Sequence, residues 1–356
     1  MKNKTNKILI DLRAKPGTGI YRYAFNLLNQ KEFCCEAYQD SFTDYRKPGR
    51  ISPFSAICRF LYECFVLPFL LRKKRIRLFH CTKNFGLPLF SLGTRRILTI
   101  QDLIPLQLPE YAPNRLTRIY YYWNIFLSCA VADHILCISR FTANELIRLF
   151  PFVRKKLTIT YLGVNPQYFA QSSTKKEDLP SGLKGKYILT IGGTEPRKNT
   201  KIVMNLFLKH PFDGYQLVVI GDEWNGKKFT QEEKSSHWIL HTGKVTEKQL
   251  LALYRHASLF IFPSIYEGFG LPPLEAMACG IPVIAAQASC LPEILGDAAE
   301  WFDPQSQDSL ASAIRRLLSS QKLRTELIQK GRQKAKTYTW ERTIRETASI
   351  YRTLLD

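Results

Sequence analysis

Two carboxylates on either side of a glycine-rich turn are the side chains whose types and spacing first suggest chemistry. Glu267 and Glu275 lie eight positions apart in the segment EGFGLPPLE. Prolines suit the first turn of a helix, so the N–H groups of Phe269, Gly270 and Leu271 are expected at a helix N-terminus, which attracts phosphate. Carboxylates accept two hydrogen bonds from a vicinal diol. Together these groups fit a nucleotide sugar, although two carboxylates that only cap and solvate a helix would show the same spacing.

The sequence around this turn predicts a strand, a loop, a short helix and a second strand. Leu259–Ser264 is a short apolar run without helical spacing, which is typical of a buried strand. Gly280 ends the helix, Pro282 prevents its continuation, and Ile281–Ala286 supplies another buried strand. In such a βαβ unit the loop opens at the carboxyl end of a parallel strand, where open α/β sheets bind ligands.

Two cations follow another predicted strand, Tyr187–Ile191. The segment GGTEPRKN follows this strand. It begins with a pair of glycines, of which the second is Gly193, and it contains Arg197 and Lys198. Arginine can hold a diphosphate through two parallel hydrogen bonds, and lysine can hold it as a point charge. A solvated helix start is the simpler interpretation of such cations when they are considered alone.

A further glycine loop lies near the N-terminus, after the predicted strand Lys7–Leu12. Gly17 and Gly19 lie in this loop, and Ile20–Leu28 follows with the apolar spacing of a helix. A strand, a glycine loop and a helix together form an anion-binding corner. The pattern is weaker than a dinucleotide-binding fingerprint, because the third glycine and the acidic ribose partner are missing at the expected offsets.

The string EGFGLPPLEAMACGIPV resembles the donor-binding signature of the family 4 glycosyltransferases, which are retaining enzymes of the GT-B fold. The resemblance extends over most of the chain. It implies two facing Rossmann-like α/β domains with parallel sheets and a cleft between them. The expected divisions are an N-terminal acceptor-binding domain (1–165), a linker (166–185), a C-terminal nucleotide-sugar-binding domain (186–338) and a last helix that crosses back to the N-terminal domain (339–356).

The resemblance also implies roles for individual residues. Arg197 and Lys198 are similar to the donor-phosphate ligands of the family, and with Glu267 they form the expected catalytic set. Glu267 is expected to hold hydroxyls of the donor hexose, and Glu275 the ribose diol. The other expected donor-binding positions are Gly17, Gly19, Gln101, Gly193, Val245, Gly268, Phe269, Gly270 and Leu271. No metal and no cofactor are expected, because no acidic metal-binding motif is evident in the sequence.

Gln101 departs from the family pattern. In the segment ILTIQDLIPL, Gln101-Asp102 stands where the family usually has a His-Asp pair, and that histidine shapes the binding of the donor sugar. Glutamine can bond to a hydroxyl but does not titrate near neutral pH. The departure leaves the sugar preference open. Two alternatives to a transferase also stay open, namely a catalytically inactive sugar-nucleotide-binding homologue and a nucleotide-sugar epimerase of the same fold.

The expected activity is transfer of a hexose, with retention, from a nucleoside-diphosphate sugar such as GDP-mannose or a UDP-hexose. The expected acceptor is a saccharide or a lipid-linked saccharide in polysaccharide or lipopolysaccharide biosynthesis. Residues 1–170 hold 26 Lys and Arg against 10 Asp and Glu, so most of the net charge of +21 lies in the N-terminal half. Such a surface attracts anionic partners. Nucleic acid is not expected, because no RNA-binding motif or helix-turn-helix pattern accompanies the charge.

The most apolar stretch, Ile51–Leu71, allows two interpretations. Arg59, Glu63 and Pro68 interrupt it, so it is too short for a membrane span of about 20 residues. It is either a core helix with a polar stripe or a surface-docking element, because the basic cluster Arg72–Arg77 follows directly. A second candidate for membrane contact is the aromatic run Ile119–Trp123, since Trp and Tyr favour the headgroup zone.

The nine cysteines predict free thiols and not a disulfide framework. None of them forms a CxxC pair or shows zinc-ligand spacing, and their number is odd. The N-terminal segment MKNKTNKILIDLR contains an apolar run that is far shorter than the h-region of a signal peptide. The expected location is therefore the cytoplasm, with peripheral contact to the cytoplasmic face of an anionic membrane as a further hypothesis.

Overall fold

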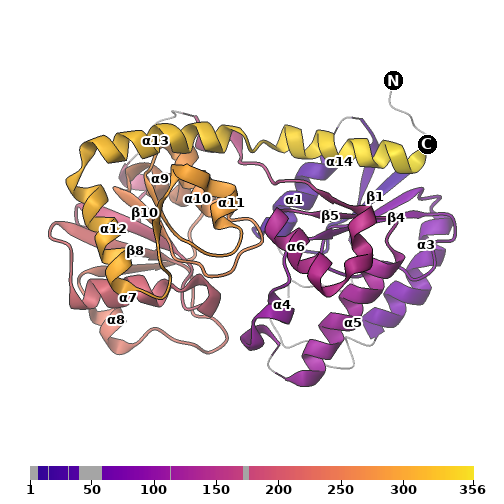
Figure 1. Ribbon diagram of the computed structural model, residues 1–356, viewed down its shortest axis with the longest axis horizontal. Helices are drawn as coiled ribbons and strands as arrows, with labels where there is room; N and C mark the ends of the chain where they lie inside the picture. Colours follow the sequence, from indigo (N-terminus) through magenta and orange to yellow (C-terminus); the bar gives the residue numbers. More distant parts are fainter. Residues whose placement is uncertain (1–6, 15, 31, 40–57, 113, 171–175) are drawn as a thin grey trace. The chain divides into compact units, whose positions relative to one another are not determined.

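The computed structural model of the chain describes residues 7–14, 16–30, 32–39, 58–112, 114–170 and 176–356 (Figure 1). Within them the chain divides into two units. Unit 1 combines Met1–Leu162 with Trp340–Asp356, and unit 2 comprises Gly163–Thr339. Each unit is built on a sheet of six parallel strands with helices on both faces. The prediction of two Rossmann-like α/β domains with parallel sheets is therefore confirmed.

The sheet of unit 1 has the strand order β2-β1-β3-β4-β5-β6, and all neighbouring strands are parallel. Side chains alternate across a strand, so the paired residues Leu9 and Phe79 face one layer of helices and Ile10 and His80 face the other. The strands are β1 (Lys7–Asp11), β2 (Cys34–Tyr38), β3 (Leu78–Cys81), β4 (Arg95–Ile100), β5 (His134–Cys137) and β6 (Leu157–Ile159).

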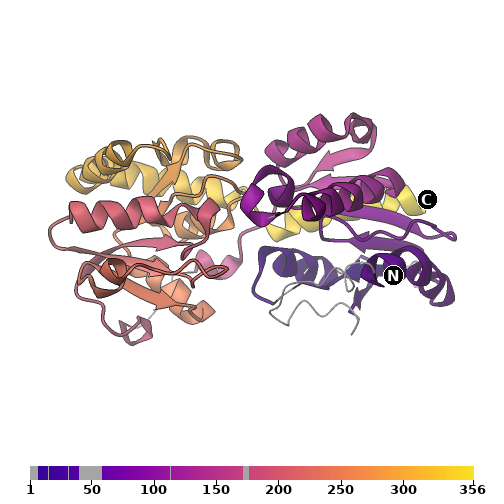
Figure 2. The same cartoon turned by 90° about the horizontal axis from the view of Figure 1, so that it is seen from below.

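Helices α1 (Gly19–Leu28) and α14 (Trp340–Leu355) pack on one face of this sheet. Figure 2 shows α14, in yellow, behind the strands of unit 1. A second layer packs on the opposite face around Leu9, Phe79 and Leu98. The helical segments on this side are the π-helical turn η1 (Tyr62–Val66), α3 (Leu67–Lys73), α4 (Ile104–Gln107), the 3-10 turn η2 (Pro109–Tyr111), α5 (Arg115–Val131), α6 (Arg140–Leu149) and the 3-10 segment η3 (Pro151–Lys156).

A buried polar chain fixes α14 to the sheet of unit 1. His80 Nδ1 lies 2.6 Å from the hydroxyl of Tyr351, and His80 Nε2 lies 2.7 Å from the hydroxyl of Thr99. The hydroxyl of Tyr23 on α1 lies 3.1 Å from the same Thr99 hydroxyl. Burial lowers the pKa of His80 to about 3, so the ring stays neutral and can both donate and accept. The last helix of the chain is therefore part of the unit formed by the N-terminal residues.

The sheet of unit 2 has the strand order β12-β11-β10-β7-β8-β9, again with parallel neighbours. The predicted strand, loop, helix and strand between residues 259 and 286 are confirmed, with only small shifts at their ends. The strands are β7 (Lys186–Ile191), β8 (Tyr215–Ile220), β9 (Ile239–Gly243), β10 (Leu259–Phe262), β11 (Val283–Ala286) and β12 (Glu300–Phe302).

Helices cover both faces of this second sheet as well. Helices α7 (Thr200–Lys209) and α12 (Gln307–Ser319) pack on the face that contains Ile188 and Ile261. Helices α9 (Glu247–His256) and α10 (Leu271–Cys279) contact each other, and α13 (Gln321–Lys336) packs against α10. Shorter segments complete the unit, namely η4 (Pro166–Tyr168), η5 (Lys176–Asp178), η6 (Pro196–Lys198), α8 (Gln231–Ser235), α11 (Leu291–Leu295) and η7 (Gly296–Ala298). Residues 171–175 of the predicted linker lie outside the described residues.

In both sheets the strand order reverses beside the first strand of the unit. Strand β1 lies between β2 and β3, and β7 lies between β8 and β10. The loops that follow the two strands at such a reversal lead to opposite sides, which leaves a crevice at the carboxyl edge where α/β proteins bind ligands. In unit 2, Arg197 and Lys198 follow β7 and Glu267 follows β10, so the predicted chemical groups lie at this reversal.

Two further findings bear on the sequence-based expectations. All nine cysteines lie among the described residues, and each is a free thiol. Within the part of the chain that the structure describes, no helix has both the length and the apolar character needed to cross a bilayer.

Candidate functional site

The carboxyl ends of β7 and β10 bring two cations against one carboxylate. Glu267 Oε1 lies 2.6 Å from Lys198 Nζ and 2.9 Å from Arg197 Nη1. The hydroxyl of Ser264 donates to the same oxygen at 2.7 Å. The side chains of Arg197, Lys198 and Glu267 are between 12% and 15% exposed, so this cluster is largely shielded from water. A single carboxylate oxygen thus holds both cations in place.

Backbone contacts join the loops that carry these side chains. The carbonyl oxygen of Arg197 accepts a hydrogen bond from the N–H of Ile265 at 2.8 Å, and the hydroxyl oxygen of Ser264 lies 3.1 Å from the same carbonyl oxygen. Arg197 is also held from a second side, because its Nε donates to Glu195 Oε1 at 2.7 Å. The geometry of the cluster therefore depends on the loop after β7 and the loop after β10 together.

The electrostatic environment keeps Glu267 ionised. Burial by itself would raise the pKa of this carboxyl, but the charges of Lys198 and Arg197 and the hydrogen bonds from Lys198 and Ser264 lower it to about 2. An ionised carboxylate accepts hydrogen bonds from sugar hydroxyls, whereas Arg and Lys donate to phosphate oxygens. Among the described residues, no group of three or more His, Cys, Asp or Glu side chains is arranged to hold a metal ion.

The start of α10 has the conformation that the glycine-rich turn predicts. Gly270 precedes the helix with φ of 90°, and a Cβ at this position would lie 2.8 Å from Leu291 Cδ2. A residue with a side chain would be strained here both by its backbone and by this contact. Pro272 and Pro273 carry no N–H, so the amide donors near the helix start belong to Leu271 and to the turn before it.

The turn before α10 is anchored by contacts on both sides. The N–H of Glu267 donates to the hydroxyl of Ser289 at 3.1 Å, which ties the turn to the loop after β11. The ring of Phe269 is buried and lies 5.5 Å from the ring of Tyr338. Gly268 lies buried between these two anchors. The turn is therefore held on both sides by contacts within unit 2.

Glu275 has a different environment from Glu267. It is the fifth residue of α10, so it lies in the second helical turn. Glu275 is 4% exposed, and its carboxylate accepts a hydrogen bond from the hydroxyl of Tyr254 on α9 at 3.3 Å. Burial and the neighbouring Glu275 raise the pKa of Tyr254, so the phenol stays protonated and can donate. Glu275 thus pairs with a phenol, and Glu267 pairs with cations.

Gly193 and Val245 lie on loops at the same edge of the sheet. Gly193 follows β7 with φ of +57°, and a Cβ there would lie 2.1 Å from the carbonyl oxygen of Asp222, which leaves no room for a side chain. The N–H of Thr194 donates to that oxygen at 3.2 Å. Val245 follows β9, and its neighbour Lys244 forms an ion pair with the Asp222 carboxylate at 2.7 Å. The loops after β7, β8 and β9 therefore meet around Asp222.

The remaining expected positions belong to unit 1. Gly17 and Gly19 flank Thr18, whose side chain caps α1, and all three residues are exposed. Gln101 follows β4 and is 4% exposed, and its Nε2 donates to the carbonyl oxygen of Thr82 at 3.0 Å. The glutamine amide is thus held by the loop after β3.

Unit 1 also buries a cluster of charges that the motifs did not reveal. Arg13 donates to both carboxylate oxygens of Asp11, at 2.9 and 2.8 Å, and its Nη1 lies 3.0 Å from Glu63 Oε1. Arg59 pairs with the same Glu63 oxygen at 3.1 Å, and Lys83 Nζ lies 3.5 Å from Asp11 and 3.6 Å from Glu63. Burial and the nearby Arg13 lower the pKa of Lys83 to about 8. This cluster lies at the ends of β1 and β3, where the strand order of unit 1 reverses.

Sequence reasoning also missed several residues of the unit 2 site. Ser264 and Ser289 hold Glu267 through its side chain and its N–H, and Tyr254 bonds to Glu275. One signal for Ser264 is available in the sequence, because it is the last residue of a predicted buried strand and stands three positions before Glu267. No comparable signal marks Ser289 or Tyr254, since their partners come from other elements.

Comparison with known proteins gives matches over both units. Residues 171–334 match the model of the family described as "Glycosyl transferases group 1", and residues 32–168 match the model described as "Glycosyltransferase Family 4". O-antigen chain mannosyltransferase B from Escherichia coli is 32% identical to this chain over 283 residues, which cover 76% of this chain and 73% of that protein.

Solved structures resemble the fold over nearly the whole chain. Sucrose-phosphate synthase from Thermosynechococcus elongatus matches with a TM-score of 0.76 at 20% identity, covering 98% of this chain and 99% of the other. HepE from Anabaena, in complex with UDP, matches with a TM-score of 0.71 at 15% identity, covering 98% of this chain and 100% of the other. At these identities the similarity concerns the fold.

Proposed function

The chain belongs to the group 1 glycosyltransferases, retaining enzymes of family 4 with the GT-B fold, and we propose that it transfers a hexose from a nucleoside-diphosphate sugar. GDP-mannose is the first candidate donor, because the Escherichia coli relative is named a mannosyltransferase. A UDP-hexose is the second, because HepE has the same fold and was solved with UDP. The proposed acceptor is a saccharide or a lipid-linked saccharide of a cell-surface polysaccharide or lipopolysaccharide.

The observation that carries this proposal is the meeting of Arg197, Lys198 and Glu267 where the strand order of unit 2 reverses. In the proposed reaction the bond between the anomeric carbon of the hexose and a β-phosphate oxygen breaks, and negative charge accumulates on that phosphate. Two cations in a shielded site can stabilise this charge more in the transition state than in the bound donor. Each donor of this kind typically contributes about 2–4 kcal/mol.

The other groups at this edge are assigned to parts of the donor. Glu267 accepts hydrogen bonds from hydroxyls of the hexose, and Glu275 accepts them from the ribose diol. The amides of Gly193 and of residues 268–271 donate to the diphosphate, and the backbone around Val245 holds the base. Arg197 and Lys198 can keep their contacts with Glu267 when the donor binds, because each cation carries more N–H groups than those that bond to Glu267.

Retention of configuration follows from the face on which the acceptor attacks. The acceptor oxygen forms its bond to the anomeric carbon on the face from which the diphosphate leaves, and the acceptor proton passes to a β-phosphate oxygen. We assign no covalent nucleophile. The products are the glycosylated acceptor and the nucleoside diphosphate, so a diphosphate held by Arg197 and Lys198 serves first as leaving group and then as proton acceptor.

We assign acceptor binding to unit 1. Its basic surface would concentrate an anionic acceptor. Gly17 and Gly19 lie in an exposed loop at the carboxyl edge of its sheet, and we keep their assignment to donor binding, with a backbone that approaches the donor phosphates and also the acceptor. Gln101 presents a neutral amide where a titrating histidine is usual, so recognition of the donor sugar at this position relies on hydrogen bonding alone. The nine free thiols suit a reducing compartment, and we place the activity in the cytoplasm.

The experiment combines nucleotide binding with donor turnover. Thermal shift assays with GDP and UDP identify the base, and the corresponding hexose conjugates are then incubated with saccharide acceptors while release of the nucleoside diphosphate is followed. We expect one nucleotide to stabilise the chain and its conjugate to be consumed only with an acceptor. Interconversion of the donor hexose without transfer would indicate an epimerase. Binding of a nucleotide without turnover of any conjugate would indicate an inactive homologue, in line with the departure at Gln101.

A further inference from the structure

The helical segment before β3, residues 58–73, buries Leu67 and Leu71 in the usual way, but it also buries two charged side chains and leaves two phenylalanines exposed. Arg59 and Glu63 face the interior and are 8% and 3% exposed, whereas Phe65 and Phe69 are 49% and 66% exposed. Helices of globular proteins usually bury their apolar stripe and expose their charges. The polar stripe formed by Arg59 and Glu63 therefore faces the interior of unit 1. The first residues of the apolar stretch, 51–57, lie outside the described residues.

The exposed apolar side chains on this segment form one cluster, the α3 patch. Two of its members, Phe65 and Phe90, lie with their ring centres 6.2 Å apart. Exposed cations follow directly at Arg72, Lys73 and Lys74. The α3 patch consists of Leu61, Phe65, Val66, Phe69 and Phe90, which are between 45% and 66% exposed.

A second cluster, the α5 patch, lies on helix α5 and the segment after α6. Arg115 and Arg118 stand beside its apolar side chains, and the two arginines line a shallow hollow of about 310 Å³ together with three members of the patch. Arg154 and Lys155 are exposed next to Phe152. The α5 patch consists of Leu116, Ile119, Tyr122, Trp123 and Phe152, which are between 37% and 78% exposed.

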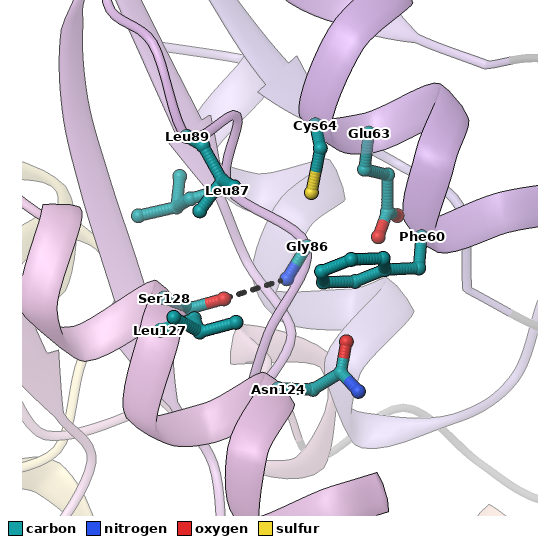
Figure 3. A pocket seen from close by; sticks show the side chains of 9 residues that line it. All are labelled: Phe60, Glu63, Cys64, Gly86, Leu87, Leu89, Asn124, Leu127 and Ser128. Carbon is teal, nitrogen blue, oxygen red and sulfur yellow. Dashed lines mark hydrogen bonds between the residues drawn. The ribbon is translucent and has the colours of Figure 1, made fainter. Parts of the chain in front are cut away.

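Both patches belong to the same packed layer of unit 1. Figure 3 shows the segment with Phe60 and Glu63 and the α5 residues Asn124 and Ser128 on either side of the chain at Gly86. The N–H of Gly86 donates to the hydroxyl of Ser128 at 3.1 Å. The cavity between them measures about 10 Å³, which is room for at most one water molecule. The two helices therefore present their outer faces as parts of one layer, with no ligand site between them.

We propose that the α3 patch and the α5 patch dock unit 1 onto the surface of an anionic lipid bilayer. Exposed apolar side chains flanked by cations fit this partner, because the former enter the headgroup and acyl boundary and the latter pair with lipid phosphates. Trp123 and Tyr122 have the amphipathic rings that favour this zone. The excess of Lys and Arg in the N-terminal half also attracts unit 1 to an anionic bilayer at longer range.

The α5 patch lies near the edge of the unit 1 sheet to which the acceptor is assigned. Helix α5 begins after the carboxyl end of β4, so Leu116 and Ile119 lie at the end of the helix nearest the edge of the sheet that carries Gln101. A bilayer held there would keep a lipid-linked acceptor close to that edge. The docking itself goes beyond the proposed transfer and does not depend on it, because it follows from exposed side chains that the transfer does not use.

Vesicle flotation with the full chain tests this inference. We expect binding to vesicles of equimolar phosphatidylcholine and phosphatidylglycerol, weaker binding to phosphatidylcholine alone, and release by salt. The charge variant Arg72→Gln/Lys73→Gln/Lys74→Gln and the apolar variants Phe65→Ser/Phe69→Ser and Leu116→Ser/Ile119→Ser should each bind at least about tenfold more weakly. All of these side chains are exposed, so folding should be retained, which circular dichroism and thermal melting verify.

Matched controls separate docking from changes in net charge or hydrophobicity. Lys201→Gln/Lys209→Gln/Lys336→Gln removes the same charge from exposed positions of unit 2, and Phe25→Ser removes an exposed ring from α1 on the opposite face of the sheet. Both controls should bind vesicles like the parent.

Equal losses in controls and variants, or no vesicle binding by the parent, would overturn the inference. A dimer in sedimentation that Phe65→Ser/Phe69→Ser dissociates, without vesicle binding, would assign the α3 patch to a second copy instead. None of these outcomes measures hexose transfer, so failure here leaves the proposed function standing.

Discussion

Lys198 Nζ lies 2.6 Å from Glu267 Oε1, although the two residues are 69 positions apart in the chain. They meet because β7 and β10 are neighbours in the sheet, with Leu259 paired to Ile188. The same carboxylate oxygen also lies 2.9 Å from Arg197. Glu267 therefore sets the position of both cations, and a change in any one of the three side chains is expected to disturb the other two.

Replacing Lys198 should slow the chemical step more than it weakens donor binding. Lys198→Ala removes a cation that bonds to the leaving diphosphate most strongly in the transition state, so kcat should fall by about 10²–10³-fold with a smaller change in KM. Steady-state kinetics with the identified donor measure this. Lys201→Ala serves as the control, because it removes an exposed lysine from the start of α7 on the same segment. A parental kcat in Lys198→Ala would show that the site is wrongly assigned.

The acid stability of unit 2 should depend on Glu267. Its pKa in the folded chain is about 2, below the ordinary value of 4.5, so its contribution is present above about pH 4.5 and is lost as the pH falls toward 2. The contribution at neutral pH amounts to about 3 kcal/mol. Urea unfolding should show Glu267→Gln less stable than the parent at neutral pH, and the difference should shrink below about pH 4.5.

The control for this pH series is Glu341→Gln, which changes an exposed carboxylate on α14. It should follow the parent at every pH, since it leaves the cluster of Arg197, Lys198 and Glu267 intact. A constant difference between the parent and Glu267→Gln across the acid range would mean that the carboxylate does not gain its charge-dependent stability from these cations.

The local features of the site could be predicted from the sequence because their causes are local. Gly280 has φ of 81° and ends α10 where the sequence placed the helix end, and β10 and β11 flank the helix as expected. Glycines and prolines restrict the backbone at their own positions, so their effect does not depend on the rest of the fold. The strand, turn and helix that carry Glu267 and Glu275 are therefore visible in one stretch of sequence.

The partners of buried charges could not be predicted, because distant elements contribute them. The spacing of Arg59 and Glu63 indicates that they share one face of a helix, but not whether that face is buried. Their burial depends on Arg13 and Lys83, which come from the ends of β1 and β3 and approach Glu63 only through the order of the strands. Tyr254, the partner of Glu275, likewise comes from another helix.

Glu275→Gln should weaken nucleotide binding while the fold is kept. The amide oxygen of glutamine can still accept the hydrogen bond from Tyr254, so the melting temperature should change little, whereas the charged acceptor for the ribose diol is lost. Because hydrogen bonds to charged groups contribute about 1.5–3 kcal/mol, the Kd of the nucleoside diphosphate should rise by at least about tenfold in calorimetry.

Tyr254→Phe provides the complementary control for Glu275. It removes the phenol that bonds to the carboxylate and should lower stability by about 1–3 kcal/mol, because Glu275 loses a buried partner. Its Kd for the nucleotide should change less than that of Glu275→Gln. If Glu275→Gln lowers the melting temperature as much as Tyr254→Phe and binds the nucleotide normally, Glu275 has a structural role only.

Gly193→Ala should destabilise unit 2 far more than Gly214→Ala. Both glycines have positive φ, of 57° and 79°, so each alanine adopts a conformation that costs about 1–2 kcal/mol. A Cβ at Gly193 would also lie 2.1 Å from the carbonyl oxygen of Asp222, whereas nothing lies within 4 Å of a Cβ at Gly214. The additional overpacking should cost about 1–3 kcal/mol or more, and thermal melting of the two variants measures it. Equal melting temperatures would contradict the close approach of the two loops.

Arg13→Ala should destabilise unit 1 by about 3–5 kcal/mol, because it leaves two buried carboxylates short of a cation. Arg13 and its partners Asp11 and Glu63 have side chains that are at most 4% exposed. The control is Arg352→Ala in the same unit, since Arg352 pairs with Glu32 at 2.7 Å while both side chains are about half exposed, at 52% and 43%. A surface pair of this kind contributes about 0–1 kcal/mol, so Arg352→Ala should remain close to the parent in urea unfolding. Similar losses in both variants would mean that the charge cluster at the ends of β1 and β3 is open to water in solution, and the assignment of Arg13 to the core of unit 1 would then be wrong.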